Sequence, residues 1–319
     1  MAREDRHPHG ATGLSGRTYL ITGANAGLGY FASEQLVRRG ATVIMTGRNP
    51  NRLASARAAL HRRIPEADTA CVQTMILDTA NLGSVRAAAA TVGSRTPLSG
   101  LLLNAGIVHP PKERMTTSDG HELVWATNVL GHYALAGALL LSLARAGGRM
   151  VWLGSVSTSV SHYDPVDPEL ADGYSGWRAY VQSKVATTAL GFEADRRLRE
   201  ANVDVTSVVA HPGYAIGGRT VGIHGVNQPS RGKRFIDNLQ TPLSHSKEAG
   251  ARVLVHALVE PEVEGGQFWG PRFVVHGAPQ VQRPDKLTRD PEIADRLWHV
   301  CEDDTGVHWP FGKAVKVRR

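Results

Sequence analysis

The glycine-rich segment T-G-A-N-A-G-L-G, residues 22–29, constrains the fold of this chain more than any other feature. It follows an apolar, β-rich run and opens a helical pattern. Glycines at positions 23, 27 and 29 let the backbone turn sharply and let a pyrophosphate approach the N-terminus of the helix. A glycine triplet alone is equally typical of an ordinary strand-to-helix turn, and its spacing here differs from the common G-x-G-x-x-G form. In this context it predicts a dinucleotide-binding βα unit.

Apolar β-rich runs alternate with helical patterns over the first two thirds of the chain. We expect strands at residues 18–22, 41–46, 70–77, 100–103, 149–153 and 203–209. We expect helices near residues 28–39, 50–62, 82–92, 120–144, 177–201, 246–259 and 292–302. This order predicts an α/β single-domain Rossmann fold, with a doubly wound parallel sheet and helices on both faces. Ligands in such a fold bind at the carboxyl ends of the strands.

Composition also favours one domain. A chain of 319 residues with 42% hydrophobic content can bury one large core, and no stretch resembles an interdomain linker. We expect a disordered lead-in at residues 1–15, the cofactor-binding and catalytic domain at residues 16–275, and a C-terminal extension at residues 276–319. The irregular stretch at residues 214–245 is typical either of a substrate lid or of a disordered surface loop.

Charge and cysteine content exclude several classes of partner. The net charge is +7, but the basic residues are dispersed and lack interleaved aromatic residues, which argues against nucleic acid and for a phosphorylated cofactor. Cys71, in a predicted strand, and Cys301, in a predicted helix, lack metal-ligand spacing, so we expect no metal site and no disulfide. Without an apolar signal or an apolar run long enough to span a membrane, the chain is expected to be cytoplasmic.

Tyr180 and Lys184 lie four residues apart on a predicted helix. Side chains at positions i and i+4 are neighbours on one helix face, so the ammonium can lower the pKa of the phenol and make it a proton donor and acceptor. The same spacing also occurs in solvated surface pairs. Combined with the glycine turn, it predicts a nicotinamide-dependent oxidoreductase.

The end of the second predicted strand indicates which dinucleotide binds. An acidic residue there would accept hydrogen bonds from the ribose of NAD, but the strand ends at Gly47-Arg48-Asn49. A guanidinium suits a 2′-phosphate, so we predict NADP(H), selected by Arg48. The alternative is that Arg48 only begins a solvated loop.

Five motifs in order give the chain a resemblance to the short-chain dehydrogenase/reductase family from about residue 16 to residue 213. They are the glycine turn, Asp78, Asn104-Ala105-Gly106, the serine of L-G-S-V, and Tyr180-x-x-x-Lys184. The segments N-V-L-G-H-Y and S-G-W-R-A-Y-V-Q-S-K most resemble the retinol dehydrogenase-like branch, which acts on bulky apolar alcohols and carbonyls.

The resemblance implies roles for matching residues. Tyr180 would protonate the substrate oxygen, Ser155 would hydrogen-bond it, Lys184 would bind the nicotinamide ribose, and Asn128 would hold a water leading towards the lysine. Ser157 is the nearest rival of Ser155. The expected cofactor contacts, including those of the glycine turn, are Gly23, Asn25, Ala26, Gly27, Leu28, Gly29, Arg48, Asn49, Asp78, Thr79, Asn104, Ala105, Gly106, Tyr180, Lys184, Pro212 and Gly213.

One position departs from the family pattern. The family often has a threonine that binds the nicotinamide carboxamide, but here that position is Gly217. Thr220 is a candidate replacement if the loop folds back. His211 is expected to be structural or pocket-lining, and His132 to pack within a helix.

These residues predict an NADPH-dependent carbonyl reductase. Trp177, Tyr174, Tyr163 and Tyr214 argue for a bulky aromatic or polycyclic ketone, although they are also typical of packing. The Ala-, Arg- and Gly-rich composition suggests an actinobacterial genome, where relatives include ketoreductases that tailor aromatic polyketides in antibiotic biosynthesis. The alternatives are an NADP-dependent alcohol dehydrogenase for retinoid- or steroid-like alcohols, a carbon-carbon double-bond reductase, and a non-catalytic NADP(H) sensor. The resemblance also implies a homo-oligomer, often formed through the helices that hold Asn128 and Tyr180.

Overall fold

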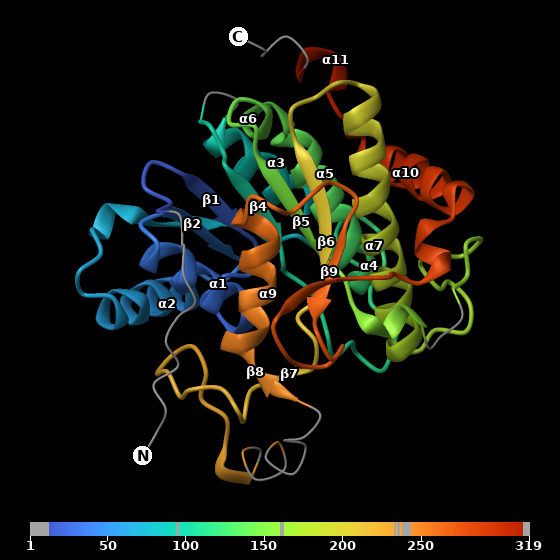
Figure 1. Cartoon of the computed structure of the whole chain (residues 1–319). Helices are drawn as coiled ribbons and strands as arrows, with labels where there is room; N and C mark the ends of the chain where they lie inside the picture. Colours follow the sequence, from blue (N-terminus) through green and yellow to red (C-terminus); the bar gives the residue numbers. More distant parts are fainter. Residues whose placement is uncertain are drawn as a thin grey trace.

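The computed structural model describes residues 13–93, 96–159, 163–232, 234, 237 and 244–314. Among them, eight strands form the central sheet in the order β10-β9-β6-β5-β4-β1-β2-β3 (Figure 1). Six of these strands lie where the sequence predicts strands: β1 (Thr18–Ile21), β2 (Thr42–Gly47), β3 (Val72–Ile76), β4 (Gly100–Leu103), β5 (Arg149–Leu153) and β6 (Thr206–Ala210). These six strands pair in parallel, and the expected Rossmann sheet is confirmed.

Four further strands were not expected from the sequence. In the central sheet, β9 (Phe268–Pro271) pairs in parallel with β6, and β10 (Pro279–Gln282) pairs antiparallel with β9. Short strands that contain proline give a weak sequence signal, because proline cannot donate to the ladder. A separate pair, β7 (Ala215–Ile216) and β8 (His245–Ser246), ties together the two ends of the 214–245 stretch.

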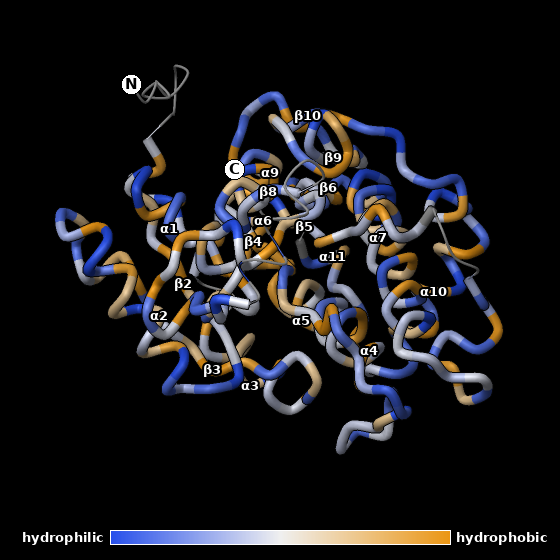
Figure 2. The backbone as a smooth tube through the Cα atoms, turned by 90° about the horizontal axis from the view of Figure 1, so that it is seen from below, coloured by the Kyte–Doolittle hydropathy of each residue, from blue (hydrophilic) through white to orange (hydrophobic). Residues whose placement is uncertain are grey.

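Helices cover both faces of the sheet and bury a separate apolar core on each. Helices α1 (Gly27–Arg38), α2 (Pro50–Arg63) and α9 (Lys247–Val259) contribute to one core. Helices α3 (Leu82–Val92), α5 (Gly131–Ala138) and α7 (Gly176–Glu200) contribute to the other. Figure 2 shows α9 on one side of β4 and β5 and α5 on the other.

The single helix expected at residues 120–144 is divided. Gly120 has φ +91°, outside helical geometry, and the Glu122 carboxylate accepts from Trp125 N at 2.7 Å, so the helix begins later. Helix α4 (Leu123–Trp125) passes into a π-helical turn (Ala126–Leu130), which carries Asn128. Helices α5 and α6 (Leu140–Ala144) follow. An apolar run does not distinguish a π turn from a regular helix.

The C-terminal helices pack on the outside of α7 and α5. Helix α10 (Pro291–Thr305) contacts α7, where Arg197 Nη2 lies 2.7 Å from Asp295 Oδ1 and the guanidinium lies 4.7 Å from the Trp298 ring centroid. Trp309 lies against Gly137 of α5, just before α11 (Phe311–Ala314). The helices expected to mediate association are therefore partly covered by the chain's own C-terminal segment.

The two cysteines are free, as expected. Cys301 is buried in α10, but Cys71 ends a 3₁₀ turn (Thr69–Cys71) before β3 rather than lying within the strand. Among the described residues, no helix combines the length and apolar character that crossing a bilayer requires. Most of the expected lead-in, residues 1–12, lies outside the described part of the chain, as do residues 233, 235, 236 and 238–243 of the expected lid.

Candidate active site

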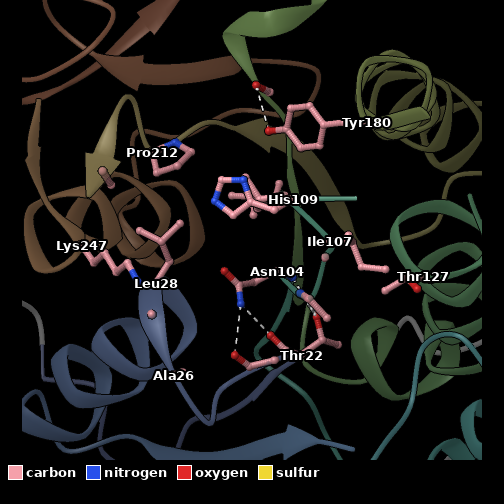
Figure 3. Close-up of a pocket in the computed structure, with 18 of the residues that line it drawn as sticks. Thr22, Ala26, Leu28, Asn104, Ile107, His109, Thr127, Tyr180, Pro212 and Lys247 are labelled. Atoms are coloured by element: carbon pink, nitrogen blue, oxygen red, sulfur yellow. Dashed lines mark hydrogen bonds between the residues drawn. The ribbon is translucent and has the colours of Figure 1, made fainter. Parts of the chain in front are cut away.

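A pocket with a cavity volume of about 940 Å³ lies at the carboxyl ends of the parallel strands (Figure 3). A cavity therefore lies where the sequence predicts the ligand site. The predicted site residues that line it are Gly23, Asn25, Ala26, Gly27, Leu28, Arg48, Asp78, Thr79, Asn104, Ala105, Gly106, Ser155, Tyr180, Lys184, Pro212 and Gly213.

Three predicted residues lie outside the lining. Gly29 is packed beneath the turn, where an added Cβ would lie 2.6 Å from Asn104 Nδ2 and from Gly23 O. Asn49 uses its side chain to cap α2, accepting from Arg52 N at 3.0 Å. Asn128 lies behind the wall at Ile107. Each supports neighbouring structure rather than facing the cavity.

The glycine turn fits a phosphate group. Gly23 and Gly27 have φ of +66° and +60°, in the left-handed region that favours glycine. Ala26, at the N-cap of α1, makes no side-chain cap hydrogen bond, so the first-turn N–H groups of this helix have no side-chain partner there. Ala26, Gly27 and Leu28 line the pocket, which makes the start of α1 suitable for an anion.

Thr22 fixes the turn against the next element of the site. Its Oγ1 accepts from the backbone N of Asn104 and of Ala105, each at 2.8 Å. Asn104 in return donates from Nδ2 to Thr22 O at 2.8 Å (Figure 3). The two pocket-lining segments, at the ends of β1 and β4, are therefore held together by hydrogen bonds.

Ser155, Tyr180 and Lys184 lie together in another part of the pocket lining, away from the glycine turn. The Tyr180 hydroxyl donates to Ser155 Oγ at 3.4 Å, and Lys184 Nζ donates to Leu153 O at 2.7 Å. Ser157 is absent from the pocket lining and donates from its hydroxyl to Ser155 Oγ at 2.9 Å. The geometry thus favours Ser155 over Ser157 as the hydroxyl that faces a ligand.

Burial is the main cause of the pKa shifts of Tyr180 and Lys184. It raises the pKa of Tyr180 above its ordinary value, partly offset by hydrogen bonds with Ser155 and Ser157. This direction is the opposite of the one expected from the sequence, because burial disfavours the charged phenolate more than the Lys184 cation, with Nζ 6.0 Å from the ring centroid, favours it. Burial lowers the pKa of Lys184 to about 8. The phenol therefore keeps its proton at neutral pH.

Asn128 braces the site from behind. Its Nδ2 donates to Ser183 Oγ at 2.9 Å, and its Oδ1 accepts from Ile107 N at 2.8 Å. Its backbone carbonyl lies 3.1 Å from His132 Nδ1, which must donate because a carbonyl only accepts. His132 Nε2 lies 3.0 Å from Thr22 Oγ1, and burial lowers the pKa of this imidazole to about 3. His132 thus links the π-helical turn to the glycine turn.

The aromatic residues expected around the substrate divide into two groups. Trp177 and Tyr214 line the pocket and are 55% and 46% exposed. Tyr163 is buried in the core, and the Tyr174 hydroxyl donates to Pro111 O at 3.3 Å outside the pocket lining. Trp177 and Tyr214 are therefore part of the pocket wall, whereas Tyr163 and Tyr174 serve packing.

Thr220 is not placed as a substitute for the missing threonine. Gly217 lines the pocket, but Thr220 Oγ1 donates to Ile216 O at 2.7 Å and accepts from Lys247 N at 2.9 Å. Thr220 is buried and lies outside the lining. His211 lines the pocket, which is one of the two roles expected for it. Its Nε2 lies 2.7 Å from Gln282 Oε1.

Sequence reasoning missed several lining residues. Among them are Ile107, Val108, His109, Thr127, Asp237 and Lys247. Those at 107–109 directly follow the Asn104-Ala105-Gly106 motif, which is a signal that could have identified them. Lys247 lies at the start of a helix whose N-terminus the sequence located within one residue, but its position beside Gly27 depends on the path of the chain from residue 214.

The parallel sheet, the glycine turn and the Ser155-Tyr180-Lys184 group define a Rossmann-fold protein of the nicotinamide-cofactor class. The profile of the short chain dehydrogenase family matches residues 17–216. The chain therefore belongs to the short chain dehydrogenase family, whose members are oxidoreductases that act on alcohol and carbonyl groups.

Individual relatives span nearly the whole chain. Human retinol dehydrogenase 14 is 32% identical over 309 residues, covering 92% of this chain and 88% of that protein. A Streptomyces protein named as a daunorubicin C-13 ketoreductase, DnrU, is 34% identical over 313 residues, covering 94% and 95%. The crystal structure of an uncharacterised Mycobacterium paratuberculosis protein has a TM-score of 0.76 and 32% identity, covering 93% of this chain and 96% of that one.

Proposed function

We propose that this protein is an NADPH-dependent carbonyl reductase for bulky aromatic or polycyclic ketones. The observation that carries the proposal is the placement of the Ser155 and Tyr180 hydroxyls 3.4 Å apart on one wall of the pocket. Two hydroxyls at this separation can both donate to a single substrate oxygen. A bound nicotinamide dinucleotide supplies the hydride in this class of protein.

The chain's own residues supply the proton and stabilise charge. Reduction of a carbonyl builds negative charge on oxygen, and positioned donors lower the barrier by stabilising that charge. Because burial keeps the Tyr180 phenol protonated, it can act as the acid. Lys184 brings a buried cation close to the phenol, which favours the phenolate once the proton has left. Ser155 donates to the same substrate oxygen and orients it.

Arg48 supports the choice of NADP(H). It is exposed at the end of β2 and lines the pocket, at the position where NAD-binding proteins of this fold place a carboxylate. A guanidinium is suited to a 2′-phosphate because it offers several donors in a planar fork. The other predicted cofactor residues in the lining are proposed to contact the remainder of the dinucleotide.

The substrate end of the pocket supports a large apolar ligand. Trp177, Tyr214, Ile107 and Val108 line the pocket, which has a cavity volume of about 940 Å³. Likeness to DnrU, named for the ketone at C-13 of daunorubicin, favours a polycyclic ketone and a role in polyketide tailoring. Likeness to retinol dehydrogenase 14 favours a second candidate, oxidation of a bulky apolar alcohol.

Product analysis tests this proposal. Purified protein is supplied with NADPH and a panel of anthracycline-type ketones, steroid ketones, quinones and retinal, and products are identified by mass spectrometry. We expect stoichiometric NADPH oxidation and formation of the secondary alcohol from at least one polycyclic ketone. A saturated ketone as product would instead indicate a double-bond reductase. Binding of NADPH without turnover, while NADP⁺ supports oxidation of the corresponding alcohols, would favour the dehydrogenase.

A further inference from the structure

Lys247 is a cation in the pocket that the catalytic group does not use. It is the first residue of α9, and its side chain lines the cavity. A Cβ placed on Gly27 would lie 3.9 Å from both Cδ and Nζ of Lys247. The ammonium therefore lies beside the glycine that opens α1. Figure 3 shows the Lys247 side chain alongside Leu28, near the start of α1 at Ala26.

The backbone that carries Lys247 is held firmly in place. Its N–H donates to Thr220 Oγ1 at 2.9 Å, and Ser246 caps α9 by accepting from Ala249 N at 3.1 Å. Gln35 Nε2 of α1 donates to Glu248 O at 2.9 Å, which fixes the start of α9 to α1. The ammonium is thus presented from a helix end rather than from a free loop.

Helix α9 also lies unusually close to the glycine turn. An added Cβ on Gly250 would lie 3.0 Å from Leu28 Cδ2 and 3.0 Å from Ala215 Cβ. This close approach of α9 to Leu28 is what brings the Lys247 stem across the start of α1. The lysine and the first turn of α1 consequently converge on one region of the cavity from two sides.

We propose that Lys247 binds the pyrophosphate of the dinucleotide, opposite the N-terminus of α1. This inference rests on the proposed function in one respect, namely that the pocket takes a nicotinamide dinucleotide. First-turn N–H groups and an ammonium are complementary to phosphate oxygens. Arg48 lies at the end of β2, so the two cations contact different phosphates: Lys247 the one shared by NAD and NADP, Arg48 the one unique to NADP.

Asp237 is a carboxylate in the same lining and sets the local charge balance. Its Oδ2 accepts from Gly218 N at 2.6 Å, within the stretch that precedes α9. The alternative role for Lys247 is therefore structural, as a cation that balances the Asp237 carboxylate, the one acidic residue at positions 214–246. A structural lysine would affect folding stability, whereas a pyrophosphate-binding lysine would affect affinity for every ligand that carries a pyrophosphate.

Binding of three ligands to the purified protein separates these roles. Dissociation constants for NADPH, NADH and ADP-ribose are measured by calorimetry for wild type, Lys247→Gln, Lys247→Arg and Arg48→Gln. We expect Lys247→Gln to weaken all three by a similar factor, about tenfold to a hundredfold, as for loss of a charge-assisted hydrogen bond. Lys247→Arg should restore most of the affinity. Arg48→Gln should weaken NADPH alone, and the exposed control Lys286→Gln should change none of them.

The other possible results would contradict either the role of Lys247 or the proposed function. Unchanged affinity for NADH and ADP-ribose in a folded Lys247→Gln protein would overturn the inference. A lower melting temperature without a change in affinity would assign Lys247 the structural role and would also overturn it. Loss in NADPH binding alone would move Lys247 to the 2′-phosphate and contradict the proposal. If wild type binds none of the three ligands, the proposed function itself fails, independently of Lys247.

Discussion

Lys184 is a buried cation whose charge depends on pH near neutrality. Burial lowers its pKa to about 8, so the ammonium is present below that pH and is lost as the pH rises through it. Because the charge favours the phenolate of Tyr180, we predict that reduction slows as pH rises through about 8. The measurement is kcat/KM for the ketone across pH 6–10, at saturating NADPH, since this quantity reports ionisations of the protein form that takes up the ketone.

Lys184→Arg provides the control for this profile. A guanidinium keeps its charge throughout the measured range. We expect a lower rate in this variant, because the geometry changes, but no fall with a midpoint near pH 8. If the variant shows the same midpoint as wild type, a different group controls the profile.

Several residue roles could not be read from the sequence. Tyr180 and Lys184 are recognisable from their spacing, but the direction of the pKa shift of Tyr180 depends on burial, which spacing does not reveal. Asn49 matches a cofactor position, yet it is also the N-cap residue that precedes α2, and helix capping uses its side chain. A motif fixes residue type and spacing, whereas the competing local hydrogen bonds appear only in three dimensions.

At the scale of elements, the junction between the π-helical turn and the glycine turn depends on a neutral histidine. The pKa of His132 is lowered to about 3 by burial, whereas the unfolded chain takes up this proton near the ordinary value of 6.5. As pH falls from 6.5 towards 3, the unfolded state therefore binds more protons and the free energy of unfolding decreases. The contribution approaches about 1.4 kcal/mol per pH unit within this window.

Denaturant unfolding of wild type and His132→Asn tests this prediction. We expect the variant to be less stable at pH 7, and the difference between the two proteins to shrink as the pH falls from 6 to 4. His299→Asn, on the exposed side of α10, should follow the wild-type curve. Parallel curves for wild type and His132→Asn would show that His132 does not titrate in this way.

Elements were predictable where their residues gave a clear pattern. Strands β1–β6 and helices α1, α3, α7 and α9 lie within a few residues of the expected ranges, because apolar β-rich runs mark the strands and helical periodicity marks the helices. Strands β7 and β8 contain two residues each, too few for any periodicity. The division of residues 120–144 depends on the backbone of Gly120 and on the Glu122 cap, neither of which alters the apolar pattern.

At the scale of the whole molecule, the C-terminal segment is part of the core. Trp298 is fully buried, with its ring centroid 5.0 Å from that of Tyr133 and 4.8 Å from that of Trp309. We predict that Trp298→Ala lowers the free energy of unfolding by about 3–5 kcal/mol, as for a large aromatic removed from a packed core. Trp177→Ala, at a 55% exposed position, should change it by less than about 0.5 kcal/mol. Equal effects of the two variants on denaturant unfolding would contradict this description.

The position of the C-terminal segment also bears on association. Because α10 and Trp309 cover part of α7 and α5, the homo-oligomer implied by the resemblance requires another surface or a smaller part of these helices. The sequence located α10 but not the surface on which it packs. The same holds for Lys247, whose place in the pocket depends on how α9 returns to α1. Contacts between segments distant along the chain are the part of the site that local pattern does not encode.

The most direct test of the account is the rate of ketone reduction by Tyr180→Phe with the best substrate from the panel. The variant removes only the phenolic hydroxyl, so we predict that kcat falls by about 10²–10⁴-fold, the contribution of a general acid, while the variant still binds NADPH. Tyr174→Phe, whose hydroxyl contacts Pro111 outside the pocket lining, should retain the wild-type rate. A Tyr180→Phe protein that binds NADPH and reduces the ketone at the wild-type rate would contradict the account.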